Sequence, residues 1–85
     1  MNRKRLLKRV ASGALQNVGF QDMANLVEGF GFVPRRTKGS HHIYSHADIP
    51  ELVNLQNAGG KAKPYQIRQL LRLVERYNMQ LKEEK

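Results

Sequence analysis

The sequence contains no cysteine, which excludes disulfide bonds, a thiol nucleophile and a thiolate metal site. No apolar run in it approaches the roughly 18 residues that a membrane-spanning helix needs. The apolar pair Leu6 and Leu7 near the basic N-terminus is too short for the core of a signal peptide. We therefore expect a soluble protein that works in the reducing cytoplasm.

Acidic residues are also scarce, because 7 Asp and Glu face 15 Lys and Arg and leave a net charge of +8 in 85 residues. A chain of this length makes one small domain with a limited core, so we expect its function to lie on the surface or in a shallow groove. A surface this basic fits a polyphosphate partner through counterion release, or an acidic protein. The basic residues crowd at positions 3–9 and 35–38 and recur at Lys61, Lys63 and in the last helix.

The apolar pattern predicts an α+β domain. Apolar residues from Phe20 to Phe30, and again from Ile67 to Val74, recur at three- and four-residue spacing and indicate two amphipathic helices. Pro64 suits the first turn of the second of these helices. Three short strands are expected between them, at 32–36, 41–46 and 52–55, and a short basic helix at 3–10 precedes all of these elements.

The order α-β-β-β-α predicts a three-stranded antiparallel sheet with both helices on one face and the other face open to solvent, the layout of double-stranded-RNA-binding domains. We divide the chain into a basic N-terminal arm at 1–17, the domain at 18–80 and a disordered tail at 81–85. The arm is either additional surface for RNA or a partner, or a solvated extension, and we expect the extension.

The stretch TKGSHHIYSH at 37–46 holds all three histidines of the chain. A metal site is disfavoured, because neighbouring residues such as His41 and His42 point to opposite faces of a strand and because His42 and His46 lie far apart. A second interpretation is structural, with each imidazole half-buried and hydrogen-bonded. The third is catalytic, because histidine takes up and returns a proton near neutral pH.

Metal-free RNA cleavage needs little beyond the groups found here. A base removes the proton of a ribose 2′-hydroxyl, the oxygen attacks the neighbouring phosphate, and cations stabilise the developing charge. Arg35, Arg36 and Lys38 supply cations just before the histidines. Gly39 allows a phosphate to approach the backbone closely, and the N–H groups of the turn at Gly39 and Ser40 are candidate anion donors.

Two segments, GFGFVPRRTKGSHHIYSH and LVNLQNAGGKAKPYQIRQLLRLVE, strongly resemble the HicA (YcfA-like) family of bacterial toxins. The resemblance covers about residues 20–77 and rests on the GSHH element between two strands and on the Lys-Pro that opens the last helix. It implies a domain of the double-stranded-RNA-binding type and a metal-independent mRNA endoribonuclease, an mRNA interferase, that blocks translation without a cofactor. It also implies a HicB-like antitoxin, which we expect to cover the region of His41.

The resemblance implies that His41, the first histidine after Gly-Ser, is catalytic, with Gly39 as the motif glycine. His42 stays a possible second catalytic residue: if Ile43 faces the helices, alternation turns His42 and Tyr44 to the open face, where Tyr44 could stack on a base, and sends His41 inward. One departure is Ala47 after His46, where the family usually has proline.

The residues expected to bind RNA surround the histidine motif and continue into the loop before the last helix. The alternative function is a non-catalytic RNA-binding module of the same fold, in which basic side chains hold the RNA backbone and the histidines only pack or touch phosphates. The expected RNA-binding residues are Arg35, Arg36, Lys38, Gly39, Ser40, Lys61 and Lys63.

Overall fold

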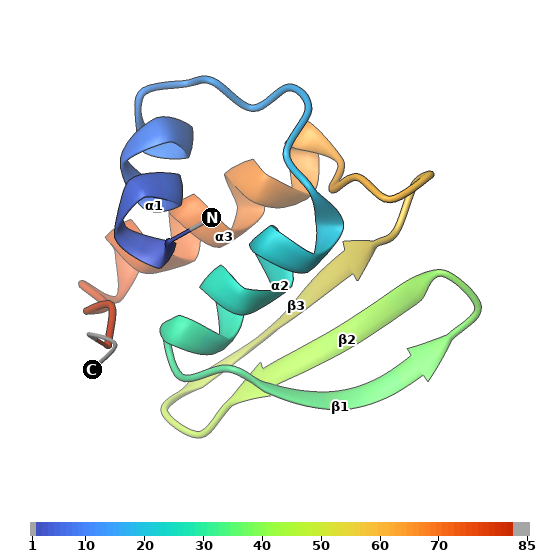
Figure 1. The fold of residues 1–85 in the computed structure, drawn as a ribbon. Helices are drawn as coiled ribbons and strands as arrows, with labels where there is room; N and C mark the ends of the chain where they lie inside the picture. Colours follow the sequence, from blue (N-terminus) through green and yellow to red (C-terminus); the bar gives the residue numbers. More distant parts are fainter. Residues whose placement is uncertain (1, 83–85) are drawn as a thin grey trace.

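The computed structural model describes residues 2–82 and confirms the predicted α+β layout. The three strands form one antiparallel sheet in the order β1-β2-β3, and the helices lie on one face of it (Figure 1). No helix among residues 2–82 has the length and apolar character to cross a membrane. The elements are α1 (Arg3–Ala11), α2 (Phe20–Gly29), β1 (Val33–Lys38), β2 (His41–His46), β3 (Ile49–Gln56) and α3 (Pro64–Arg76).

The short N-terminal helix is part of the packed domain. α1 begins after Asn2, whose Oδ1 accepts the backbone N–H of Arg5 at 3.1 Å, as a helix N-cap does. Leu6 and Val10 lie on the same face of α1, because residues four apart share one helix face. Each is 1% exposed and belongs to the same hydrophobic cluster as residues of α2 and α3. The expectation of a solvated extension is therefore wrong for α1: its apolar side is buried, Arg3 donates to the carbonyl of Asn25 in α2, and Lys4, Arg5 and Lys8 are exposed.

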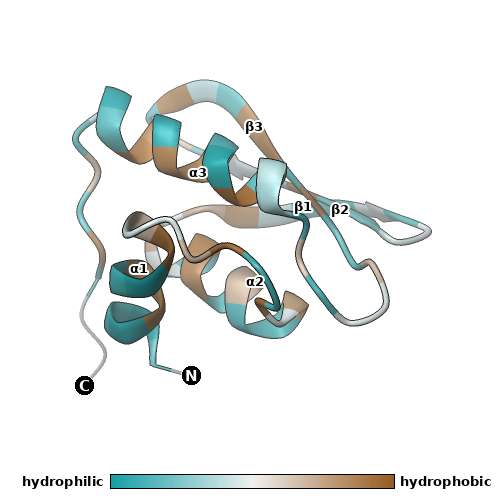
Figure 2. Ribbon diagram, turned by 90° about the horizontal axis from the view of Figure 1, so that it is seen from above, coloured by the Kyte–Doolittle hydropathy of each residue, from teal (hydrophilic) through white to brown (hydrophobic). Residues whose placement is uncertain are grey.

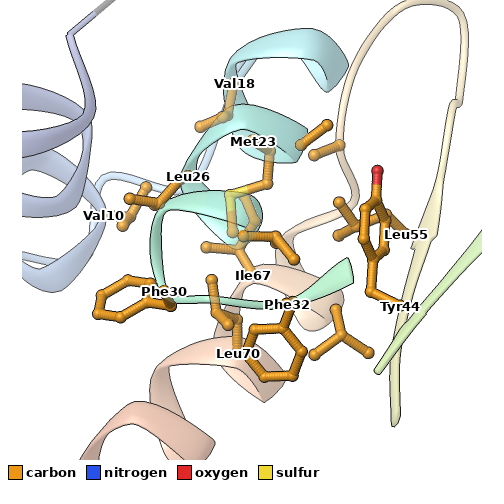
Figure 3. Packing of buried hydrophobic residues seen from close by; sticks show 14 of the residues in the cluster. Val10, Val18, Met23, Leu26, Phe30, Phe32, Tyr44, Leu55, Ile67 and Leu70 are labelled. Atoms are coloured by element: carbon orange, nitrogen blue, oxygen red, sulfur yellow. The ribbon is translucent and has the colours of Figure 1, made fainter. Parts of the chain in front are cut away.

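The core fills the space between the helices and the covered face of the sheet. Apolar residues gather where the three helices face one another and the strands (Figure 2). Figure 3 shows Leu26 of α2 facing Val10 of α1, and Leu70 of α3 beside Phe32. The largest side chains that are almost fully buried come mainly from the three helices and β3 and include Leu6, Met23, Leu26, Leu55, Ile67 and Leu70.

Glycine and proline mark the end of α2, the start of α3 and an edge of the sheet. Gly31 adopts φ +95 just after α2, a conformation that favours glycine, and its N–H donates to the carbonyl of Glu28. Pro64 stands in the first turn of α3. Pro34 lies in β1, which is an edge strand of the sheet, as its missing N–H requires.

The chain around the C-terminal end of α3 is held against α2. The N–H of Lys82 donates to the carbonyl of Gly29 at 2.9 Å, and Leu81 is half-buried against the core. Of the tail predicted at 81–85, residues 83–85 lie outside the described part of the chain.

Candidate functional site

The turn between β1 and β2 carries the candidate site at one end of the sheet. Lys38 and His41 pair directly across the two strands, so Gly39 and Ser40 form a two-residue connection. Gly39 adopts φ +59, a left-handed conformation that residues with a Cβ rarely take. The tight turn therefore places Lys38 opposite His41.

The side chains of β2 alternate, and the even-numbered residues face the helices. The ring of His42 lies 4.7 Å from the ring of Phe20 in α2, and Tyr44 is only 4% exposed. The ring of His46 lies 5.3 Å from that of Phe32. His41, Ile43 and Ser45 consequently point to the open face.

This arrangement corrects two expectations. Ile43 faces the open side of the sheet and not the helices, so alternation does not turn His41 inward. Tyr44 is not on the open surface and has no face free for a base, because it packs in the core beside Leu55 (Figure 3). Burial, with a smaller effect from the negative charge of Glu28, raises the pKa of Tyr44 above its usual value and keeps the phenol neutral.

The open face around His41 is basic and polar. His41 is exposed, and its Nδ1 lies 3.4 Å from Oδ1 of Asn54 on β3. Lys38 stands opposite His41 on β1, and Arg36, opposite Ile43, is the next residue of β1 on the same face. Cations and an exposed imidazole thus share one face of the sheet.

Arg35 occupies the point where the register of β1 shifts between Pro34 and Arg36. Its Nε donates to Oγ of Ser45 at 2.6 Å, which holds its side chain over the same open face. A bulge places two successive residues against one residue of the partner strand, so both arginines can lie on one side. The sequence predicted the cations but not the irregularity that groups them.

The two lysines of the loop before α3 have different surroundings. The loop starts beside the turn, because the N–H of Asn57 donates to the carbonyl of Ser40 at 2.8 Å, and both segments lie at the same end of the sheet (Figure 1). Lys61 Nζ donates to Oδ1 of Asn17 at 3.1 Å, so its head group is held by the segment before α2. Lys63 is the residue that precedes α3.

The other two histidines have partners on the helix-covered side. His42 Nδ1 lies 3.3 Å from Oγ1 of Thr37, and its ring rests on Phe20. His46 Nδ1 accepts the N–H of Asp48 at 3.0 Å, and a Cβ on Gly31 would come within 2.9 Å of His46 Nε2. Within residues 2–82, no three His, Asp or Glu side chains come together in a group that could hold a metal ion.

Sequence reasoning missed Asn54, the hydrogen-bond partner of His41. Asn54 lies between Val53 and Leu55, both of which are fully buried, so alternation along β3 places its side chain on the open face. That part of its position was readable from the sequence. Its proximity to His41 depends on the register in which Asn54 pairs with Ile43, and this register is set by the whole sheet.

A comparison with protein families identifies a family for this chain. A family model described as "HicA toxin of bacterial toxin-antitoxin" matches residues 14–75, which include the entire sheet, the β1–β2 turn and nearly all of α3. No curated protein and no solved structure matches significantly. The match covers most of the chain and confirms the resemblance seen in the sequence. The chain therefore belongs to the HicA family of toxins of bacterial toxin-antitoxin systems.

Proposed function

We propose that this protein is a metal-independent endoribonuclease that cleaves mRNA in the cytoplasm and so blocks translation. The observation that carries the proposal is the position of His41: exposed on the open face of the sheet, opposite Lys38 and beside a tight glycine turn. Membership of a toxin family supplies the biological setting.

His41 acts as the general base in this proposal. Its neutral imidazole takes the proton of a ribose 2′-hydroxyl, and the 2′-oxygen forms a bond to the adjacent phosphorus while the bond from phosphorus to the 5′-oxygen breaks. The leaving 5′-oxygen takes a proton from solvent. The products are a 2′,3′-cyclic phosphate and a free 5′-hydroxyl, so no metal ion and no cofactor is required.

The cations of the open face stabilise the reacting phosphate. Negative charge grows on its oxygens as the 2′-oxygen approaches, and nearby positive side chains lower the energy of that state. Lys38 is nearest to His41 in the strand pairing, and Arg36 and Arg35 extend the positive surface along β1. We propose that the RNA backbone binds along this positive surface. Gly39 and Ser40 lie at its end, and Lys61 and Lys63 provide further contacts.

His42 is the weaker candidate for the base. Its ring packs on Phe20 and its Nδ1 lies close to Thr37, so approach to an RNA backbone on the open face is blocked by the sheet itself. These contacts support a structural role for His42. His41 has the exposure that a base acting on a large polymer needs.

A HicB-like antitoxin is the proposed protein partner. The net charge of +8 favours an acidic partner surface. A partner that covers the face with His41 blocks activity most directly. We infer that the antitoxin covers His41 and places carboxylates against Arg36 and Lys38. A complex that leaves His41 fully open would contradict this mode of inhibition.

The test compares the wild-type protein with His41→Ala and, as a matched control, His42→Ala. Induced expression should inhibit growth for the wild type and not for His41→Ala. Circular dichroism should show that the wild type and His41→Ala are both folded. Undiminished toxicity of folded His41→Ala would reject His41 as the base.

Purified protein with labelled RNA, with and without a chelator, separates the remaining alternatives. Cleavage that persists in chelator and yields cyclic phosphate ends supports the proposal. Binding with intact RNA at every dose would make the protein a non-catalytic RNA-binding module. Cleavage that the chelator abolishes would indicate a metal-dependent nuclease instead.

A further inference from the structure

Asn54 lies beside His41 on the open face, and its Oδ1 is 3.4 Å from His41 Nδ1. An amide oxygen can only accept a hydrogen bond, so Nδ1 must carry the proton when the two atoms interact. In the neutral imidazole one ring nitrogen is protonated and the other holds a free lone pair. The contact therefore selects the tautomer with hydrogen on Nδ1 and the lone pair on Nε2.

The three histidines differ in this respect, and the difference is informative. His46 Nδ1 accepts the N–H of Asp48, which leaves the ring proton on Nε2. His42 Nδ1 faces the Oγ1 of Thr37, a hydroxyl that can donate or accept and so selects neither tautomer. Only His41 faces an atom that is solely an acceptor.

We propose that Asn54 is a positioning residue, which holds the His41 ring in the tautomer with a free lone pair on Nε2. This inference deepens the proposed RNA cleavage and rests on it for its kinetic consequences. A general base must present an unprotonated nitrogen to the proton that it removes. With Nδ1 bonded to Asn54, Nε2 on the far side of the exposed ring is the nitrogen that can reach a 2′-hydroxyl.

The neighbours of His41 on β3 carry no charge that would compete with Asn54 for the imidazole ring. On that strand the neighbours of His41 are Gln56, its paired residue, and Asn54, and neither side chain titrates. On β1 the neighbour is Lys38, a cation that cannot accept the Nδ1 proton. Asn54 is the neighbour whose side-chain oxygen lies 3.4 Å from the ring, so it is placed to set the orientation of the ring.

The tautomer is measured directly by NMR, independently of any activity on RNA. Protonated and unprotonated ring nitrogens of histidine are distinguished in ¹⁵N spectra, and these are compared for wild type, Asn54→Ala and Asn54→Asp at a pH where the rings are neutral. We expect His41 to carry its proton on Nδ1 in the wild type and in Asn54→Asp, and to lose this preference in Asn54→Ala. His46 is the internal control, with its proton on Nε2 in all three proteins.

Kinetics provide the second readout. Asn54→Ala should lower kcat on labelled RNA on the order of 10-fold with little change in KM, because the base is mispositioned while RNA binding stays intact. Asn54→Asp should recover part of that loss and move the acidic limb of the pH–rate profile to higher pH, because a carboxylate favours the protonated ring.

The possible outcomes separate this inference from the proposed cleavage. An unchanged His41 tautomer in Asn54→Ala, or an Nε2 proton in the wild type, would overturn the role of Asn54 even if the protein cleaves RNA. The tautomer could instead differ between wild type and Asn54→Ala as expected while the wild type shows no nuclease activity. That result would establish the Asn54–His41 contact and reject the cleavage proposal.

Discussion

His41 and His42 are adjacent in the chain, and their side chains lie on opposite faces of the sheet. His41 is exposed on the open face next to Asn54, whereas the ring of His42 packs at a tilt against Phe20 of α2. The first histidine is therefore available for chemistry, and the second contributes to the fold. Different experiments should report on the two residues.

Replacing His42 with Ala should destabilise the protein more than replacing His41. Loss of the ring contact with Phe20 removes an aromatic pair worth about 1 kcal/mol beyond its buried area. His41→Ala removes an exposed side chain and should change the free energy of unfolding by no more than about 0.5 kcal/mol. Urea denaturation measures both, and equal losses would contradict the assignment of the two faces.

Replacing Gly39 with Ala should lower the free energy of unfolding by about 1–2 kcal/mol, since an L-residue in the left-handed region is strained. Among residues 2–82, no heavy atom beyond the glycine and its two chain neighbours lies within 4 Å of an added Cβ, so the cost comes from the backbone and not from a clash. Gly39→Asn is the control and should cost less, because asparagine tolerates this conformation. Equal stability of Gly39→Ala and wild type would show that the turn relaxes to another shape.

Leu6→Ala should destabilise the whole domain by about 2–5 kcal/mol, because the leucine is 1% exposed and its removal leaves a cavity in the shared core. Lys8→Ala in the same helix is the control, since Lys8 is exposed and its replacement should cost no more than about 0.5 kcal/mol. Thermal unfolding of both variants is compared with wild type. If Leu6→Ala unfolds like Lys8→Ala, α1 is only an appended segment.

The free energy of unfolding should fall in acid, in part because the carboxyl of Glu51 becomes protonated. The hydroxyl of Tyr77 donates to Glu51 Oε1 at 2.6 Å and is the main reason that the pKa of this carboxyl lies below its ordinary value, with a smaller contribution from Arg76. A lowered pKa in the folded state stabilises the protein above the ordinary pKa of the group, and this stabilisation is lost as the pH falls through the folded value.

The measurement is the free energy of unfolding of wild type and Glu51→Gln across the acidic range. The wild type should be the more stable of the two near neutral pH, and the difference should shrink as the carboxyl becomes protonated. A difference that does not depend on pH would show that the charge of Glu51 is not responsible.

RNA affinity should depend on the open face more than on α1. Lys38→Gln removes a cation opposite His41, so the slope of log affinity against log salt should decrease by about 0.7–0.9 if this lysine neutralises one phosphate. Arg5→Gln removes one charge from an exposed position of α1 and serves as the control. Equal effects of the two changes would make the basic helix a second RNA-binding surface.

Much of the fold was readable from the sequence because its helices are strongly amphipathic and its turns carry glycine and proline. The periodic apolar residues of α2 are buried, and in α3 Ile67 and Leu70 are buried whereas Val74 is half-buried. The N-terminal helix was predicted as an element, but its role was misjudged. A short basic helix with Leu6 and Val10 four residues apart looks the same whether or not a partner helix covers them.

The sequence by itself determined the order of the elements, the basic character of the chain and the glycine turn that precedes the histidines. It also determined that His41, Ile43 and Ser45 share one face of β2, because side chains alternate along any strand. Only the tertiary structure decided which face that is. HHIYSH offers aromatic and aliphatic groups on both sides, so the choice depends on pairing with β3, where Val53 and Leu55 turn Tyr44 and His42 toward the helices and leave His41 outside.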